Sequence, residues 1–183
     1  MVKGVRVQIR DVSETEHPAL QALLRSAYKA VLARLSAEDA ETFSQSFEPA
    51  IAKYAARGTW LAMVREESLA GCVAYFKPFA TKHPLFQGNC AHVQLLGVSP
   101  EETRKQIGRG LMLHCMSRAK TDGANQMLLQ TSELMPEARR LYESLGFSIR
   151  QPLPSVWGQP TYLYGRLLNN AGSPPIETPQ PAS

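Results

Sequence analysis

Residues 92–113, HVQLLGVSPEETRKQIGRGLML, decide the fold of this chain. The stretch begins as an apolar run, turns at a Ser-Pro pair, continues through a charged loop and enters an apolar-faced helix near Ile107. The first N–H groups of a helix have no intrahelical acceptor and lie at the positive end of its dipole. This order of strand, loop and helix predicts an anion site, to which Arg104, Lys105 and Arg109 add positive charge.

The apolar run before the loop predicts a strand that contains a glycine, Gly97. Glycine inside a strand often marks a bulge or a close approach of a ligand, and Gly108 and Gly110 predict the same freedom at the helix start. Alternate residues of a regular strand share one face of the sheet. The face that carries the polar groups is expected to contain His92, Gln94, Leu96 and Val98.

Two segments resemble the GCN5-related N-acetyltransferase (GNAT) family. Residues 98–112, VSPEETRKQIGRGLM, are similar to the acetyl-CoA pyrophosphate loop of that family, which reads Arg/Gln-x-x-Gly-x-Gly/Ala after a V-x-P turn. Residues 138–147, ARRLYESLGF, are similar to its closing helix and Gly-Phe pair. Together the two segments identify the chain as similar to this family over roughly residues 5–167.

The loop fits the family pattern in two registers. Without gaps, Thr103 takes the basic or amide position, Gln106 takes the first glycine position and Gly108 takes the second. A shifted register that starts at Lys105 restores both glycines but needs two extra loop residues. We prefer the ungapped register, because IGRGLM then overlays the I-G-R-A-L-L run that is common in the family.

The resemblance implies an α/β fold: a single GNAT-like domain with a mixed, mostly antiparallel sheet flanked by helices. A splayed pair of parallel strands would hold acetyl-CoA as co-substrate, its pantetheine arm on the strand and its pyrophosphate on the loop. The residues implied to bind it are Leu96, Gly97, Val98, Thr103, Arg104, Lys105, Gln106, Ile107, Gly108 and Arg109. A primary amine of a small molecule or a peptide would be the acceptor, and the resemblance leaves a homodimer possible.

Acyl transfer from a thioester needs a neutral amine and a proton for the departing thiolate. The resemblance implies that Tyr142 is the general acid, and a phenol with a pKa near 10 is protonated at neutral pH. Relatives often have a glutamate base where this chain has Gln94, so His92 is the candidate base. Both candidates have a structural alternative, as a core tyrosine and a hydrogen-bonded strand histidine.

Two departures from the family pattern leave a second function open. Gln94 cannot take a proton, and Met135 stands where the family commonly has an asparagine. These residues, together with Thr103 and Gln106 in the loop, fit a non-catalytic acyl-CoA-binding or regulatory module on the same fold. Tyr142 and the basic loop favour the enzyme.

The composition fits one globular domain: the chain has 183 residues, 44% of them hydrophobic and 20% charged. A formal net charge of +4 with scattered basic residues predicts no nucleic-acid partner. No apolar run approaches the ~20 residues of a membrane helix, so no membrane partner is expected. Three widely spaced cysteines fit neither a disulfide framework nor a zinc site, which predicts a cytoplasmic protein without a metal.

Periodicity predicts the order of the elements. Strands are expected at 5–10, 59–65, 69–76, 89–98, 126–131, 148–150 and 161–167. Helices are expected at 17–35, 37–56, 107–120 and 136–145. Loop 77–88 is expected to overhang the ligand, and the proline-rich segment 151–160 to separate the last two strands. The domain is expected to span residues 1–168, followed by a disordered proline-rich tail at 169–183.

Overall fold

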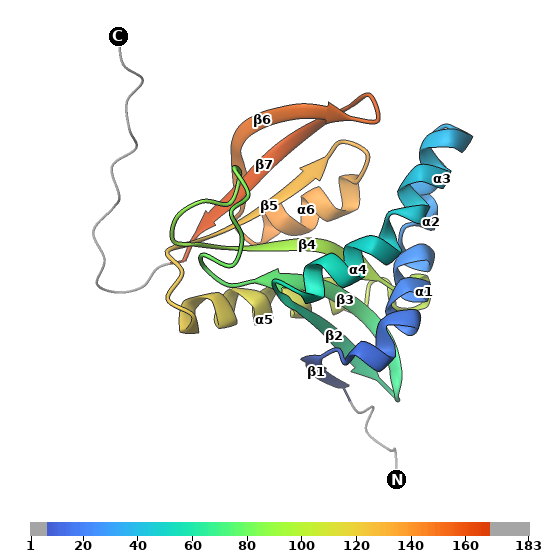
Figure 1. Cartoon of the computed structure of the whole chain (residues 1–183), viewed down its shortest axis with the longest axis horizontal. Helices are drawn as coiled ribbons and strands as arrows, with labels where there is room; N and C mark the ends of the chain where they lie inside the picture. Colours follow the sequence, from blue (N-terminus) through green and yellow to red (C-terminus); the bar gives the residue numbers. More distant parts are fainter. Residues whose placement is uncertain (1–6, 169–183) are drawn as a thin grey trace.

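Seven strands form one sheet in the computed structural model, which describes residues 7–168 (Figure 1). They are β1 (Val7–Asp11), β2 (Thr59–Arg65), β3 (Ser68–Phe76), β4 (Cys90–Val98), β5 (Gln126–Ser132), β6 (Ser148–Val156) and β7 (Gln159–Leu167). Their order in the sheet is β1-β2-β3-β4-β5-β7-β6, and every neighbouring pair is antiparallel except β4 and β5. The mixed, mostly antiparallel sheet is thereby confirmed.

Helices cover both faces of this sheet (Figure 1). One face carries α1 (His17–Ala27), α2 (Lys29–Leu32), α3 (Ala37–Gln45) and α4 (Phe47–Ala55). The other carries α5 (Ile107–Thr121) and α6 (Pro136–Ser144). Two single 3₁₀ turns, η1 (Glu14–Glu16) and η2 (Pro100–Glu102), precede α1 and α5. Each helix layer closes its own hydrophobic core against the sheet.

The first two predicted helices are each divided in the structure. The segment 17–35 is broken at Tyr28, which has φ −92° and ψ 2°, and its second half ends at Leu32. The segment 37–56 is broken at Ser46. Pro49 follows this break. In a continuous helix its ring would clash with the carbonyl of residue 45, and it has no N–H to donate to that carbonyl. The periodicity therefore found the helices, whereas the steric effect of a proline divided one of them.

The apolar stripes of the later helices lie where the sequence places them. The stripe of α5 is buried and consists of Leu111, Met112, Cys115, Met116 and Ala119. Tyr142 and Leu145 are buried under the last helix, where Gly146 adopts a φ of 81° and lets Phe147 fold back. The N–H of Phe147 donates to the carbonyl of Tyr142 at 3.0 Å, which closes the end of α6. The predicted exit at this glycine is confirmed.

The last hairpin is longer than predicted. Strand β6 continues through Pro152 and Pro154 to Val156, so the expected loop 151–160 is wrong. Proline is tolerated because β6 is an edge strand, where the missing N–H can face solvent. The turn after it has positive φ at both Trp157 (49°) and Gly158 (69°), the backbone of a tight two-residue hairpin.

Some expectations fall beyond the described residues. The predicted tail 169–183 and the first residues of the 5–10 strand lie outside 7–168. Within 7–168, no helix combines the length and the apolar character that crossing a bilayer requires.

Candidate active site

The parallel pair β4 and β5 separates partway along its length. Their pairing runs from Cys90 opposite Gln126 to Val93 opposite Leu129 and then stops. From Gln94 onward, the edge of β4 that faces β5 therefore has no strand partner among residues 7–168. Unpaired backbone N–H and C=O groups in such a gap can hydrogen-bond an extended ligand as a strand would.

Strand β4 contains a bulge at Leu95, which has a φ of 50° and lies where the pairing with β3 shifts register. An extra residue in one strand turns the side chains that follow to the opposite face. Leu96 and Val98 therefore pack in the core on the α5 side. His92 and Gln94 face the α1–α4 layer. The prediction that these four residues share one face is wrong, because the bulge interrupts the alternation.

Two glycines that were expected to leave room for a ligand instead leave room for the protein. A Cβ built on Gly97 would lie 3.2 Å from the Cβ of Ala27 and 3.3 Å from a methyl carbon of Leu24, so this glycine admits α1. A Cβ on Gly110 would lie 2.6 Å from the terminal methyl of Met63. The backbone of Gly97 still belongs to the unpaired stretch of β4.

The loop between β4 and α5 is exposed at residues 103–106, whereas the first turn of α5 begins with the buried Ile107 and continues with half-buried residues. Arg104 (φ 63°) and Gln106 (φ 64°) both adopt the left-handed conformation. The first hydrogen bond of the helix runs from the N–H of Gly110 to the carbonyl of Gln106 at 2.8 Å, so the N–H groups of 107–109 have no helical acceptor. In the ungapped register Gln106 stands at the first glycine, and a positive φ is what glycine permits there. The backbone thus favours that register.

The cations of this loop differ in whether they already have a partner within the described residues. The Nζ of Lys105 lies 3.3 Å from a carboxylate oxygen of Glu102, which also pairs with Arg65 at 3.0 Å. Arg109 donates to a serine hydroxyl at the end of α6 at 3.3 Å. Arg104 is exposed and forms no ion pair within residues 7–168. Arg104 is therefore the cation of this loop that can contact a ligand without giving up an ion pair or hydrogen bond to the described residues.

Tyr142 projects from α6 into the core beside this gap and is 6% exposed. Its hydroxyl forms no hydrogen bond with the described residues, and burial raises its pKa, so the phenol is protonated at neutral pH. The hydroxyl of the neighbouring Tyr28 donates to the carbonyl of Leu96 at 3.1 Å. A protonated hydroxyl without a partner can donate to a leaving group.

His92 is held between two phenyl rings. Its ring centroid lies 4.4 Å from that of Phe76 and 4.0 Å from that of Phe86, with the planes within 1° and 4° of parallel. Burial, and secondarily the charge of His83, lower the pKa of His92 to about 4. The imidazole is therefore neutral at physiological pH and is a weaker base than an exposed histidine.

We expect this burial to make stability depend on pH between about 6.5 and 4. In that window the unfolded histidine binds a proton, whereas folded His92 does not. Since the unfolded state binds more protons, the free energy of unfolding falls as pH falls, by up to ~1.4 kcal/mol per pH unit. Urea unfolding across the window should give a flatter slope for His92→Gln than for the wild type. His114→Gln, at an exposed histidine, should keep the wild-type slope, and equal slopes in all three proteins would contradict the prediction.

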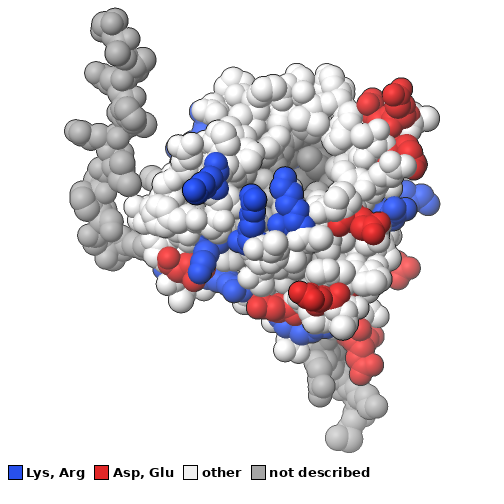
Figure 2. All heavy atoms as spheres, viewed as in Figure 1, with Lys and Arg blue, Asp and Glu red and all other residues white. Residues whose placement is uncertain are grey.

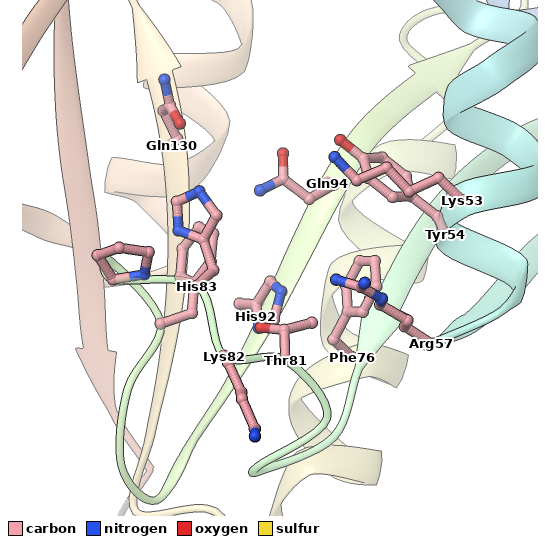
Figure 3. Close-up of a pocket in the computed structure, with 12 residues that line it drawn as sticks. Lys53, Tyr54, Arg57, Phe76, Thr81, Lys82, His83, His92, Gln94 and Gln130 are labelled. Atoms are coloured by element: carbon pink, nitrogen blue, oxygen red, sulfur yellow. The ribbon is translucent and has the colours of Figure 1, made fainter.

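Two cavities open on the α1–α4 face and share Gln94 and Gln130. The first, of about 420 Å³, lies between α4, the 77–88 loop and β4 (Figure 3). The loop thus borders a cavity, and that it overhangs the ligand stays a prediction. The second, of about 260 Å³, is bordered by Phe43 of α3 and Trp157 of the last hairpin, whose ring centroids are 4.4 Å apart. The shared glutamines lie on β4 and β5, one on each side of the gap.

The sequence reasoning missed the basic side chains of the first cavity. Lys53 lies in the last turn of α4, and Arg57, four residues later, lies just beyond the end of the helix at Ala55. That spacing was the available signal, but a helix pattern does not say what the polar side faces. Lys82 comes from the loop, where no periodicity exists to place it.

Comparisons with known proteins agree with this geometry. Residues 19–147 match the family model described as Acetyltransferase (GNAT) family. The mycothiol acetyltransferase of Thermobispora bispora is 39% identical over 61 residues, which are 33% of this chain and 21% of that protein. N-acetyltransferase family 8 member 3 of Rattus norvegicus is 33% identical over 81 residues, 44% of this chain and 36% of that protein. The chain thus aligns with less than half the length of either curated relative.

A solved structure shares the whole architecture. The PaiA N-acetyltransferase of Thermoplasma acidophilum, in complex with coenzyme A, superposes with a TM-score of 0.72 and 19% identity. The superposition covers 88% of this chain and 99% of that one. Since the family model also spans most of the sequence, from one core helix to the Gly-Phe after α6, the chain belongs to the GNAT acetyltransferase family.

Proposed function

We propose that this protein is an acetyl-CoA-dependent N-acetyltransferase, which moves an acetyl group to a primary amine of a small molecule or a peptide. The observation that carries the proposal is the gap between β4 and β5, beside the first turn of α5, whose N–H groups have no helical acceptor. This gap supplies unpaired backbone groups for an extended arm and a helix N-terminus for phosphates. The coenzyme A complex of the PaiA relative supports the same use of the fold.

The cofactor would lie along β4 and the loop that follows. Its pantetheine arm would pair with the backbone of Leu96, Gly97 and Val98, which lies in the unpaired part of the strand. Its pyrophosphate would lie over residues 103–109, where Thr103 to Gln106 bend the loop and Ile107, Gly108 and Arg109 begin the helix. The donors and the charge at this turn fit a diphosphate.

The chemistry follows from bringing an amine to the thioester carbonyl in that gap. The amine nitrogen bonds to the carbonyl carbon, the carbon–sulfur bond breaks, and the thiolate takes a proton. Tyr142 would supply this proton, because its hydroxyl is protonated and has no other partner among residues 7–168. Holding the two reactants in this geometry can lower the activation free energy by on the order of 7–11 kcal/mol.

The proton of the amine needs a separate acceptor. Gln94 lies at the mouth of the gap and cannot take it. His92 lines the adjoining cavity and stays the candidate base, acting directly or through a water molecule. Its low pKa of about 4 makes it a weak one, so the amine would have to arrive largely deprotonated.

The cysteines support a non-covalent mechanism and a reducing compartment. Cys72, Cys90 and Cys115 are free and buried. Burial raises the pKa of Cys72 and of Cys115 to about 12, so neither is a thiolate at neutral pH. We therefore assign the transfer to direct attack in a ternary complex and the protein to the cytoplasm.

A screen of primary amines with acetyl-CoA tests this function. We expect release of free coenzyme A thiol that depends on the amine, with the acetylated amine detected by mass spectrometry. Hydrolysis of acetyl-CoA without an amine is the background to subtract. If acetyl-CoA bound but no amine in a broad panel were acetylated, the non-catalytic acyl-CoA-binding module would replace the enzyme.

A further inference from the structure

The first cavity is lined by cations and by no carboxylate. Of the 12 residues around it, Lys53, Arg57 and Lys82 are cationic and none is Asp or Glu. All three are exposed, and none forms an ion pair within residues 7–168. Figure 2 shows Lys and Arg side chains beside the hollow in this face, whereas Asp and Glu lie toward its margins. The positive potential of this hollow is therefore not neutralised by the protein.

The inner part of the same cavity holds an unpaired donor. The hydroxyl oxygen of Thr81 is buried and has no hydrogen-bond partner among the described residues. Buried polar groups without a partner are unfavourable, and a ligand oxygen would relieve this one. In Figure 3, Lys53 of α4 and Arg57, which follows that helix, extend toward the strand that carries His92, and Thr81 lies beside that histidine. Two cations and a free hydroxyl thus line one space.

The same cavity also reaches the gap in the sheet. Gln94 and Gln130 line both cavities from the two sides of the gap, and both amides are neutral. The lining of the first cavity includes the aromatic rings of Tyr54, Phe76 and Phe86. A ligand in this cavity would therefore meet cations, aromatic rings and the neutral amides beside the gap.

We propose that the acceptor of this transferase is a small primary amine that carries a carboxylate or a phosphate. Lys53 and Arg57 bind its anionic group together with the Thr81 hydroxyl, and its amine lies between Gln94 and Gln130. The inference rests on the proposed acetyl transfer, because the amine end is the end nearest the gap. Charge-assisted bonds to an anion are about twice as strong as neutral ones, which makes this end the anchor.

The same charges favour the reactive form of the acceptor. Only a neutral amine attacks a carbonyl, and nearby positive charge disfavours the ammonium form. Lys53 and Arg57 would therefore fix the anion and also shift the bound amine toward its neutral state. This second effect supplies the neutral amine for attack, whereas the proton that leaves the nitrogen after attack still needs an acceptor other than Gln94.

Binding of amine-free probes tests the anion site without requiring turnover. The protein saturated with coenzyme A would be titrated calorimetrically with phenyl phosphate, with benzoate and with the neutral benzamide. We expect at least one anion to bind more tightly than benzamide, and the tighter of the two identifies phosphate or carboxylate. Lys53→Ala and Arg57→Ala should each weaken that binding by about 10- to 100-fold, the effect of losing one hydrogen bond to a charged group. The control Lys120→Ala removes an exposed lysine of α5 outside the cavity and should change nothing.

The outcomes separate this inference from the proposed function. If neither anion bound better than benzamide, or if Lys120→Ala weakened binding as much as Lys53→Ala, the anion site would be wrong whatever the enzyme acetylates. Anion binding that is lost when coenzyme A is added would place the anion on the cofactor loop and also overturn the site. Tight anion binding without any acetyl transfer would support the anion site and contradict the proposed acetyltransferase function.

Discussion

Tyr142→Phe should lower kcat by roughly 100-fold or more, the effect of losing one general acid. The hydroxyl of Tyr142 is protonated because burial raises its pKa, and it forms no hydrogen bond with any described residue. The phenylalanine ring fills the same space, so the variant should fold with little change in stability and bind acetyl-CoA as the wild type does. Steady-state kinetics, urea unfolding and an acetyl-CoA titration on one preparation measure the three quantities.

A matched control is available on the last strand. The hydroxyl of Tyr162 donates to Glu133 at 2.9 Å, away from the gap, so Tyr162→Phe should leave kcat unchanged. The pH profile gives a second check. An acid must be protonated to act, and the raised pKa of Tyr142 moves any alkaline limb of kcat above the usual pH ~10 of a phenol. If Tyr142→Phe kept the wild-type kcat, the proton on the departing thiolate would come from solvent and not from Tyr142.

Acetyl-CoA at a hundredfold excess over Kd should stabilise the folded protein by ~2.7 kcal/mol, because it binds the native state alone. The double variant Arg104→Ala, Lys105→Ala should raise the Kd for acetyl-CoA by about 10-fold or more, because the loss of one charged contact to a phosphate has about this effect. Its affinity should also depend less on salt, because two screened attractions are gone. Urea unfolding with and without acetyl-CoA, and calorimetry at two salt concentrations, measure these effects.

The loop variant needs a control for net charge. Arg25→Ala removes an exposed arginine from α1, on the opposite face from α5, and should keep the wild-type affinity and salt dependence. The Arg104 change alone should account for more of the loss than the Lys105 change, because Lys105 is already paired with Glu102. An unfolding curve that did not move with saturating acetyl-CoA would refute the cofactor assignment.

Local patterns predicted most of the elements. Strand β2 spans residues 59–65 as expected, and β3, β4 and α5 differ from expectation by single residues at their ends. These segments bury one face or both, so the chemistry of their residues repeats with the period of the backbone. The loop before α5 and the Leu-Tyr pair on α6 also carried the family resemblance, and the match over 19–147 confirms that resemblance.

The sequence alone did not place the side chains around the gap. Gly97 indicated a bulge in this strand, but its position at Leu95, which reverses the faces of Leu96 and Val98, depends on how β3 pairs with β4. Gly97 also suggested a close ligand, but the side chains near its Cβ position belong to α1 and to Cys72 of β3. Register and helix docking are set by contacts between distant segments, which a local pattern does not contain.

The cavity with Lys53, Arg57 and Thr81 shows the same division most clearly. The sequence determined that Lys53 stands near the end of a helix and that Arg57 follows it by four residues. Only the tertiary structure decided that both side chains face β4 and the 77–88 loop across a cavity of about 420 Å³. Propensity and periodicity act within about ten residues, whereas a binding site is the space left where several such segments pack together.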